Sequence, residues 1–342
     1  MSGRKGIWFP TVRAHTGTDV FTEQLAGRLE KIGFKVAVDW LPLRAEYAPW
    51  TVKPPVPPAW AGIAHVNSWL ATRFIPEGLK VVTTIHHAIH DPRLRPYKGF
   101  ARACYHRYWI RWLERRNLAR ADAVVAVSHD AARWAREILG AVKVRVIHNG
   151  IDLAAVAPVE RTGPNSPFRL IYVGTWMARK GVDLFPEVMR RLGDGYELLC
   201  IGGQPEGASR SALAGNVRLL GRITDRSELV RHLQGADAFL FPSRSEGLSL
   251  ALVEAQACGL PVIAARCSSM PEVVADGVSG ILCPPDDIAA FVAAARGLAA
   301  NRDDWSRMRA AAHSRATTEF DIEHQVRQYA DLYASLLERE GA

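Results

Sequence analysis

The stretch ADAFLFPSRSEGLSLALVEAQACGLPVIAA, residues 236–265, decides the fold of this chain. Its apolar runs at the two ends, AFLFP and LPVIAA, have the length of buried strands, and LSLALVEAQAC between them has the length of a helix. Gly259 and Pro261 end that helix just before the second run. Strand, helix and strand in this order indicate part of a parallel, doubly wound sheet.

The same alternation extends over most of the chain. The apolar runs are GIWF, FKVAVDW, KVVTTI, ADAVVAVS and KVRVIHN in the first half, and FRLIYVG, YELLCIGG, NVRLLG and GILCPP in the second. Between the halves, LAAVAPVERTGPNSP (153–167) contains prolines and no apolar period, which is typical of a domain junction. We predict an α/β protein with two Rossmann-like domains facing across a cleft, residues 1–152 with a closing helix at about 320–342, and residues 153–319.

Length and composition narrow the class of protein. No apolar window reaches the roughly 20 residues needed to span a bilayer, and the start MSGRKGIWFPTVRAH lacks the apolar core of a signal peptide. We therefore expect a cytoplasmic location. The five cysteines show no CxxC pairing, which favours reduced thiols.

The net charge of +8 is concentrated in one segment. Residues 93–120 hold nine basic side chains against one acid, Glu114, and they are interleaved with aromatic residues. A basic, aromatic helix suits an anionic membrane surface or an acidic acceptor, and it also suits a domain helix with solvated arginines. No nucleic-acid motif accompanies the charge, so we expect no nucleic-acid partner.

Glu254 lies in the middle of the apolar helix and needs a partner. An ionised carboxylate among apolar residues is costly unless it is paired. A core arginine or backbone groups could pair with it, but a vicinal diol of a ligand also matches its two oxygens.

The turn before that helix favours the ligand interpretation. Ser249 is a good helix N-cap, and the amides of Gly247, Leu248 and Ser249 would then point outward as a phosphate site. Glu254 lies roughly 7 Å further along the helix, at 1.5 Å per residue, while Glu246 precedes the turn. A diphosphate flanked by a ribose and a sugar fits this spacing.

Three weaker signals extend the site. Arg179 and Lys180 follow the strand FRLIYV and could neutralise a diphosphate. Gly17 lies in the polar turn after the first strand, although that turn is not GxGxxG. His86 ends the strand KVVTTI and could face a cleft and contact a sugar hydroxyl; a metal shared with His90 is disfavoured because Pro92 follows and no acidic ligand is near in sequence.

These motifs resemble those of retaining family 4 glycosyltransferases of the GT-B fold along the whole chain. The main marker is the E-x7-E signature, here Glu246 and Glu254. The supporting pieces are KVVTTIH, ADAVVAVS, VIHNGID, YVGTWMARKGVD, LLGRITD and SSMPEVVADGVSGILCPPDD.

The resemblance implies a role for each matched position. Glu254 would bind the ribose of a nucleoside diphosphate sugar donor, Glu246 its sugar, and Lys180 with the amides of 247–249 its diphosphate. The remaining donor-side and sugar-side positions would be Arg179, Gly174, Thr175, Arg222, Ile223, Gly17 and His86. The acceptor would be a carbohydrate or a lipid-linked molecule, as in cell-surface polysaccharide or glycolipid assembly, at the inner face of the membrane.

Departures from the family pattern leave the donor open. Thr175 stands where many relatives have arginine, Ser249 where glycine is usual, and His87 where an aspartate often follows the histidine. Such enzymes usually need no metal or other cofactor, and the chain has no D-x-D pair. The alternatives are a sugar-nucleotide epimerase, a phosphorylase, or a non-catalytic nucleotide- or membrane-binding protein. A dinucleotide oxidoreductase is the least favoured class, because neither half of the chain contains the glycine fingerprint of those enzymes.

Overall fold

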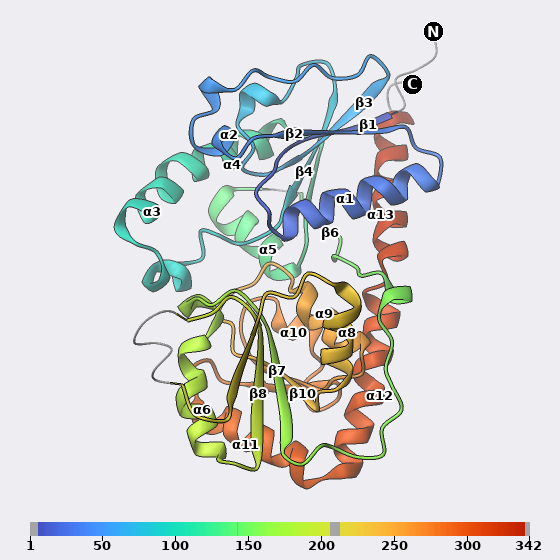
Figure 1. Cartoon of the computed structure of the whole chain (residues 1–342). Helices are drawn as coiled ribbons and strands as arrows, with labels where there is room; N and C mark the ends of the chain where they lie inside the picture. Colours follow the sequence, from blue (N-terminus) through green and yellow to red (C-terminus); the bar gives the residue numbers. More distant parts are fainter. Residues whose placement is uncertain (1–5, 142, 206–212, 339–342) are drawn as a thin grey trace. The chain divides into compact units, whose positions relative to one another are not determined.

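The computed structural model describes residues 6–141, 143–205 and 213–338, and it divides the chain into two compact units (Figure 1). Unit 1 comprises Met1–Asn149 with Glu323–Ala342, and unit 2 comprises Gly150–Ile322. The division falls close to the predicted boundary after residue 152, and the closing helix groups with unit 1. Each unit is described by itself.

Unit 1 is built on a six-stranded sheet of order β2-β1-β3-β4-β5-β6 in which every neighbouring pair is parallel. The sequence did not indicate β3, because its residues AGIAHVN are buried on both faces and show no apolar alternation. The strands are β1 (Gly6–Val12), β2 (Val36–Leu41), β3 (Ala61–Asn67), β4 (Lys80–Ile85), β5 (Ala123–Ala126) and β6 (Arg145–Val146).

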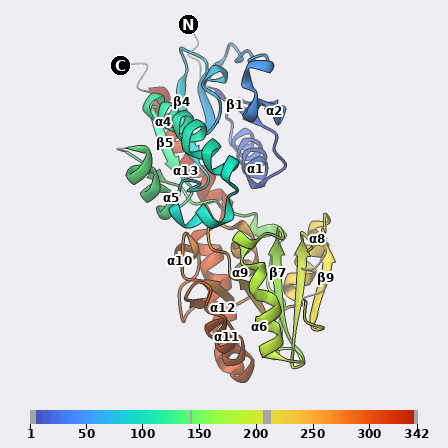
Figure 2. The same ribbon diagram turned by 90° about the vertical axis from the view of Figure 1, so that its left-hand side faces the viewer.

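Helices pack on this sheet, and one of them comes from the far end of the sequence. Phe21 of α1 meets Tyr329 of α13 with ring centroids 5.9 Å apart. Within the basic segment, residues 100–120 form one run of helix (Figure 2), and its part at Tyr105–Ile110 is a π-helical turn. The helices are α1 (Gly17–Lys31), α2 (Arg44–Tyr47), α3 (Phe100–Cys104), α4 (Arg111–Arg120), α5 (His129–Trp134) and α13 (Ile322–Glu338).

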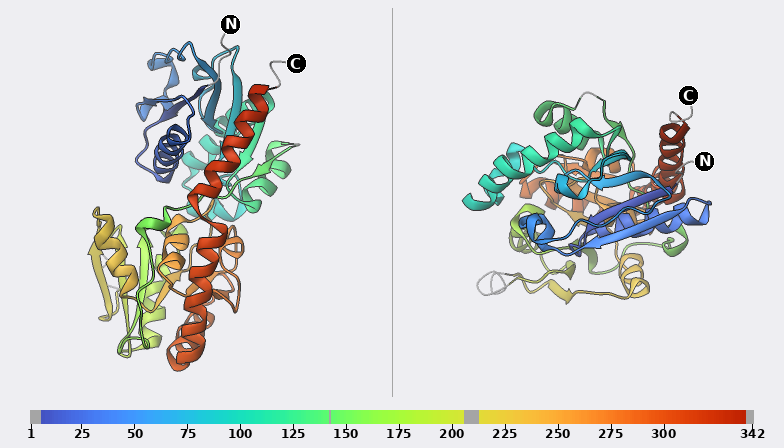
Figure 3. Two further views of the ribbon diagram at one scale, coloured as in Figure 1. Left: turned by 90° about the vertical axis from the view of Figure 1, so that its right-hand side faces the viewer. Right: turned by 90° about the horizontal axis from the view of Figure 1, so that it is seen from above.

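Unit 2 repeats the architecture with a parallel sheet of order β12-β11-β10-β7-β8-β9. Its strands are β7 (Phe168–Gly174), β8 (Tyr196–Gly202), β9 (Val217–Gly221), β10 (Ala238–Phe241), β11 (Val262–Ala265) and β12 (Gly280–Cys283). Its helices are α6 (Phe185–Leu192), α8 (Arg226–Gln234), α9 (Leu250–Ala257), α10 (Met270–Val273), α11 (Ile288–Ala300) and α12 (Arg302–Glu319). The long helix α12 packs against α9 (Figure 3).

Each sheet has one point where the strand order reverses direction. In unit 1 the reversal lies between β1 and β3, and in unit 2 between β7 and β10. Loops at the carboxyl ends of two such strands diverge to opposite faces, which leaves a crevice where ligands of open α/β sheets bind. Residues 175–180 and 242–249 follow β7 and β10, so they meet at the reversal of unit 2.

Among the described residues, no helix has the length and apolar character needed to cross a membrane.

Candidate functional site

Glu246 is a buried carboxylate in the loop between β10 and α9, 8% exposed. Its Oε1 accepts hydrogen bonds from Lys180 Nζ at 2.7 Å and from the Ser243 hydroxyl, and Arg179 Nη1 lies 3.9 Å away. Burial opposes ionisation, but the charges of Lys180 and Arg179 outweigh it and hold the pKa of Glu246 below its ordinary value. The carboxylate is therefore ionised at neutral pH.

The backbone of this loop is fixed by its neighbours. The Ser268 hydroxyl accepts from the Glu246 amide at 3.1 Å and donates to the Glu246 carbonyl at 2.7 Å. Arg244, 9% exposed, forms a two-point ion pair with Asp183 at 2.7 and 2.8 Å and also bonds Asp286 at 2.7 Å. These anchors could not be predicted from the sequence, because charged side chains are mostly solvated and the partners are far apart in the chain.

The cations come from a tight turn after β7. Ala178–Lys180 form one 3-10 turn, and Gly181 follows with φ +75°. A Cβ at Gly181 would lie 2.2 Å from the Pro242 carbonyl oxygen. Only glycine therefore lets this turn lie so close to the loop that follows strand β10. Lys180 thereby reaches Glu246, whereas the Arg179 guanidinium donates to the Ser245 carbonyl.

The end of β7 is packed closely as well. Gly174 pairs with Gly202 of β8, and a Cβ on Gly202 would lie 2.3 Å from the Gly174 carbonyl oxygen. The Tyr172 hydroxyl donates to the Thr175 carbonyl at 2.9 Å. Gly174 and Thr175 therefore lie at the carboxyl end of β7, and Thr175 carries no positive charge.

The N-terminus of α9 lies directly behind Glu246. Ser249 is its N-cap residue, as expected, but its hydroxyl makes no capping hydrogen bond. Gly247 and Leu248 are the two residues between Glu246 and this cap, and all three residues 247–249 are buried. The first turn of α9, whose amides lack partners within the helix, therefore follows the ion-paired Glu246 closely in the chain.

Most of α9 is buried, in keeping with its apolar sequence, and Glu254 lies on its partly exposed side. The Glu254 side chain is 17% exposed, and its Oε1 accepts from Arg226 Nη1 at 2.9 Å. Burial raises the pKa of Glu254, with Arg226 opposing the rise. Its partner is thus an arginine, but one on the surface at the start of α8, with a side chain 42% exposed, which a ligand could replace.

Arg222 and Ile223 lie in the loop between β9 and α8, four and three residues before Arg226. Gly221 at the end of β9 has φ +73°, which turns the chain sharply into this loop. Asp225 then caps α8 by accepting from the Ser227 amide at 2.8 Å. Arg222 and Ile223 therefore belong to the same loop that carries Arg226 to Glu254.

In unit 1, His86 follows β4 beside the reversal point. Its Nε2 lies 2.9 Å from Asn67 Oδ1, and Asn67 Nδ2 donates to Thr11 at 3.1 Å, so His86 Nε2 carries the hydrogen. Burial lowers the pKa of His86 to about 3. The imidazole is therefore neutral, with Nδ1 as its acceptor nitrogen.

Gly17 begins α1 in the loop after β1. Asp19 organises this loop by accepting from the Ala14 and His15 amides at 3.1 and 2.8 Å, with His15 at φ 55°. A Cβ on Gly17 would meet nothing within 4 Å, so the space over the helix start is open. The helix N-terminus at Gly17 is thus accessible to a ligand.

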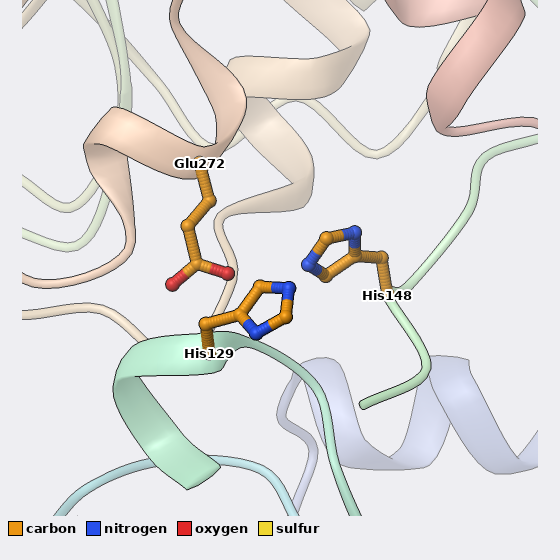
Figure 4. Close-up of side chains that lie close together, drawn as sticks. All are labelled: His129, His148 and Glu272. Atoms are coloured by element: carbon orange, nitrogen blue, oxygen red, sulfur yellow. The ribbon is translucent and has the colours of Figure 1, made fainter. Parts of the chain in front are cut away.

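Two further histidine arrangements lie in unit 1, and the sequence did not indicate either. His90 Nε2 bonds Glu114 Oε2 at 2.6 Å, so His90 and His86 have different partners. The rings of His129 and His148 meet edge to face with centroids 5.6 Å apart, after β5 and β6 (Figure 4). Glu272, also labelled in Figure 4, belongs to unit 2.

Two families of known proteins match this chain, one mainly in unit 1 and the other in unit 2. Residues 59–155 match Glycosyltransferase Family 4, and residues 167–301 match Glycosyl transferases group 1. These matches support a glycosyltransferase of the family 4 type. The sequence resemblance is confirmed at this level, although the E-x7-E signature itself is not tested by these matches.

Curated relatives and solved structures agree with this assignment. The glycogen synthase of Mycobacterium tuberculosis is 31% identical over 206 residues, 57% of this chain and 49% of that protein. The amylovoran biosynthesis glycosyltransferase AmsK of Erwinia amylovora is 31% identical over 209 residues, 57% and 51% of the two chains. The chain thus aligns with about half the length of these relatives.

The solved structures show the fold. Sucrose-phosphate synthase from Thermosynechococcus elongatus has a TM-score of 0.79 at 19% identity and covers 97% of this chain and 99% of its own. Anabaena HepE in complex with UDP and glucose has a TM-score of 0.72 at 15% identity, covering 97% and 100%. The two parallel sheets and these neighbours confirm the predicted pair of Rossmann-like domains, the GT-B fold.

Proposed function

We propose that this protein is a retaining glycosyltransferase that moves a sugar from a nucleoside diphosphate sugar, UDP- or GDP-linked, to an acceptor hydroxyl without a metal. The observation that carries the proposal is the ionised Glu246 carboxylate, buried with Lys180 at the strand-order reversal of unit 2. A buried ion pair is weak evidence for stability, and this one lies where open α/β sheets bind ligands.

Unit 2 would hold the donor. Lys180, Arg179 and the amides of 247–249 would bind the diphosphate, beside the backbone of Gly174 and Thr175. Glu254 would exchange Arg226 for the ribose hydroxyls, with the loop at Arg222 and Ile223 against the base. Glu246 would contact the sugar. Unit 1, with Gly17 and the neutral His86, would serve the acceptor and the reacting sugar.

The reaction would break the bond between the anomeric carbon and the donor's β-phosphate oxygen. Lys180, Arg179 and the start of α9 would stabilise the negative charge that develops on the diphosphate. The carboxylate of Glu246 would face the positive charge on the sugar ring. The acceptor oxygen would form the new bond on the same face, and its proton would pass to the departing phosphate.

The comparisons suggest which substrates to test first. HepE has solved structures with UDP and with UDP-glucose, so uridine donors come first. AmsK is named for amylovoran biosynthesis, which supports a carbohydrate or lipid-linked acceptor in cell-surface polysaccharide or glycolipid assembly.

The test combines nucleotide binding with turnover. We expect one of UDP, GDP or ADP to raise the melting temperature, and one sugar conjugate to be hydrolysed slowly in the presence of EDTA. Glu254→Ala should weaken nucleotide binding by roughly tenfold or more, since the ribose loses a charged hydrogen-bond partner. Glu246→Gln should lower turnover by about 10²-fold or more with little change in nucleotide affinity.

Each alternative predicts a different result in these assays. An epimerase would convert the sugar of the donor with no acceptor present. A non-catalytic protein would bind the nucleotide and release no sugar from any conjugate. Unchanged turnover in Glu246→Gln would remove the central role given to this carboxylate.

A further inference from the structure

The helical run from Phe100 to Arg120 exposes three large aromatic side chains. Phe100 is 86% exposed, Tyr108 69% and Trp112 47%. The opposite side of the run is buried in unit 1 through Leu113 and Asn117. Exposed aromatics of this size are unusual on a helix whose other side already packs on a domain.

The π-helical turn at Tyr105–Ile110 aligns these aromatics. In a regular α-helix of 3.6 residues per turn, the residues eight and twelve positions after Phe100 would lie at increasing angles around the helix axis. The wider i→i+5 turn reduces the rotation per residue, so the angles between Phe100, Tyr108 and Trp112 are smaller and the three side chains lie toward one side of the run. Such turns occur often at functional sites, and this one creates a single apolar stripe.

Arginines lie over two of the three rings of the stripe. Arg107 lies over the Tyr108 ring at 5.8 Å, and Arg116 lies over the Trp112 ring at 5.5 Å. Within residues 93–120, all of which the structure describes, the one acid is Glu114, and it is buried against His90 and Ser68. The run itself therefore presents cations and aromatics with no exposed carboxylate, and an acid of another element, the partly buried Glu46 of α2, interacts with Arg102.

A basic cavity continues this surface. It has a volume of about 880 Å³ and lies at the amino ends of β5 and β6, the edge opposite to the candidate site of unit 1. Arg115, on α4 next to Trp112 and Arg116, is part of its wall. Its other cations are Arg136, Lys143 and Arg145, and its wall also includes Asp122, which pairs with Lys80.

We propose that this docking face, the stripe at 100–112 with the basic cavity, binds the surface of an anionic lipid bilayer. Aromatic rings with polar edges favour the level of the lipid headgroups, and clustered arginines are attracted to a negatively charged leaflet. A nucleic acid or an acidic protein would match the cations but would give Phe100 no apolar environment. The docking face does not involve the donor residues, so it stands or fails independently of the proposed transfer.

Vesicle sedimentation tests the docking face with the full chain. We expect binding to vesicles of phosphatidylglycerol mixed with phosphatidylcholine, weaker binding at high salt, and little binding to phosphatidylcholine alone. Arg107→Glu with Arg116→Glu should lower partitioning by roughly tenfold or more, as should Lys143→Glu with Arg145→Glu. The triple variant Phe100→Ser, Tyr108→Ser, Trp112→Ser should release the protein at all salt concentrations.

Matched controls separate the docking face from charge or apolar surface in general. Trp50→Ser removes another exposed aromatic of unit 1, 68% exposed, and Arg307→Glu reverses an exposed arginine of α12; both should bind vesicles as the wild type does. Equal melting temperatures would show that the variants fold. The proposal is overturned if mixed vesicles are not bound, if the triple variant still binds, or if inorganic phosphate binds the cavity while vesicles do not.

Discussion

At the scale of single residues, the pairing of Glu246 with Lys180 carries the argument for a catalytic site. Both side chains are largely buried, 9% and 15% exposed, and removing one partner of such a pair leaves the other charge unpaired. Ser243 and Arg179 reduce that cost in part, since both also reach the carboxylate. The pair is thus fixed in place before any ligand binds.

Replacing Lys180 with methionine should therefore affect stability and binding together. We expect the free energy of unfolding to fall by roughly 3 kcal/mol, because Glu246 loses its closest cation in a buried place. Affinity for the nucleoside diphosphate should fall as well, since a phosphate-binding charge is lost. Urea unfolding and nucleotide titration measure the two effects.

The double variant Lys180→Met, Glu246→Gln is the control. It should recover much of the lost stability, because neither charge is left alone, but it should not recover binding. Stability losses that simply add in the double variant would show that the two side chains do not interact in solution.

At the scale of elements, the sequence predicted the strands and helices whose apolar pattern is local. The apolar runs KVVTTI and FRLIYVG form strands with the predicted bounds, Lys80–Ile85 and Phe168–Gly174. It did not predict β3, which is buried on both faces, or the π-helical turn, which depends on packing. The signature residues Glu246 and Glu254 could be selected, but their partners Lys180 and Arg226 are set by the tertiary fold, and Arg226 and Arg244 were missed.

The ends of β3 and β4 give a prediction on pH. His65 is buried between Tyr333 and Thr84, at 2.6 and 2.7 Å, and burial lowers its pKa to about 3, assisted by His86. Below the ordinary pKa of 6.5 the unfolded chain binds a proton that the folded chain does not, so stability falls as the pH falls from 6.5 toward 3.

One histidine with this lowered pKa should reduce the free energy of unfolding by about 2 kcal/mol between pH 7 and pH 5, at 1.36 kcal/mol per pH unit below 6.5. We expect His65→Gln to be less stable than the wild type at pH 7 but to lose less stability on acidification, by about that amount. Urea titrations at the two pH values measure the difference. Parallel pH profiles for the two proteins would contradict the neutral, buried state of His65.

At the scale of the whole molecule, the chain passes between the units twice, at 149–150 and 322–323. The two passages run side by side within unit 2. Ile151 donates to the Phe320 carbonyl at 2.9 Å and accepts from the Ile322 amide at 3.0 Å. A Cβ on Gly150 would lie 2.5 Å from the Ile322 Cα, so glycine is required there. Helix α13 then returns the end of the chain to unit 1.

This connectivity predicts that the two units unfold separately and that α13 stabilises unit 1. Tyr333 of α13 is fully buried, so Tyr333→Ala should cost unit 1 roughly 3–5 kcal/mol. Amide exchange should accelerate in β3 and β4 and stay unchanged in β7 and β10. The matched control is Phe239→Ala in β10, also fully buried and stacked on Phe241 at 5.6 Å, which should give the reverse pattern. If either variant accelerates exchange equally in both sheets, the units form one cooperative structure, and α13 stabilises the whole chain through it.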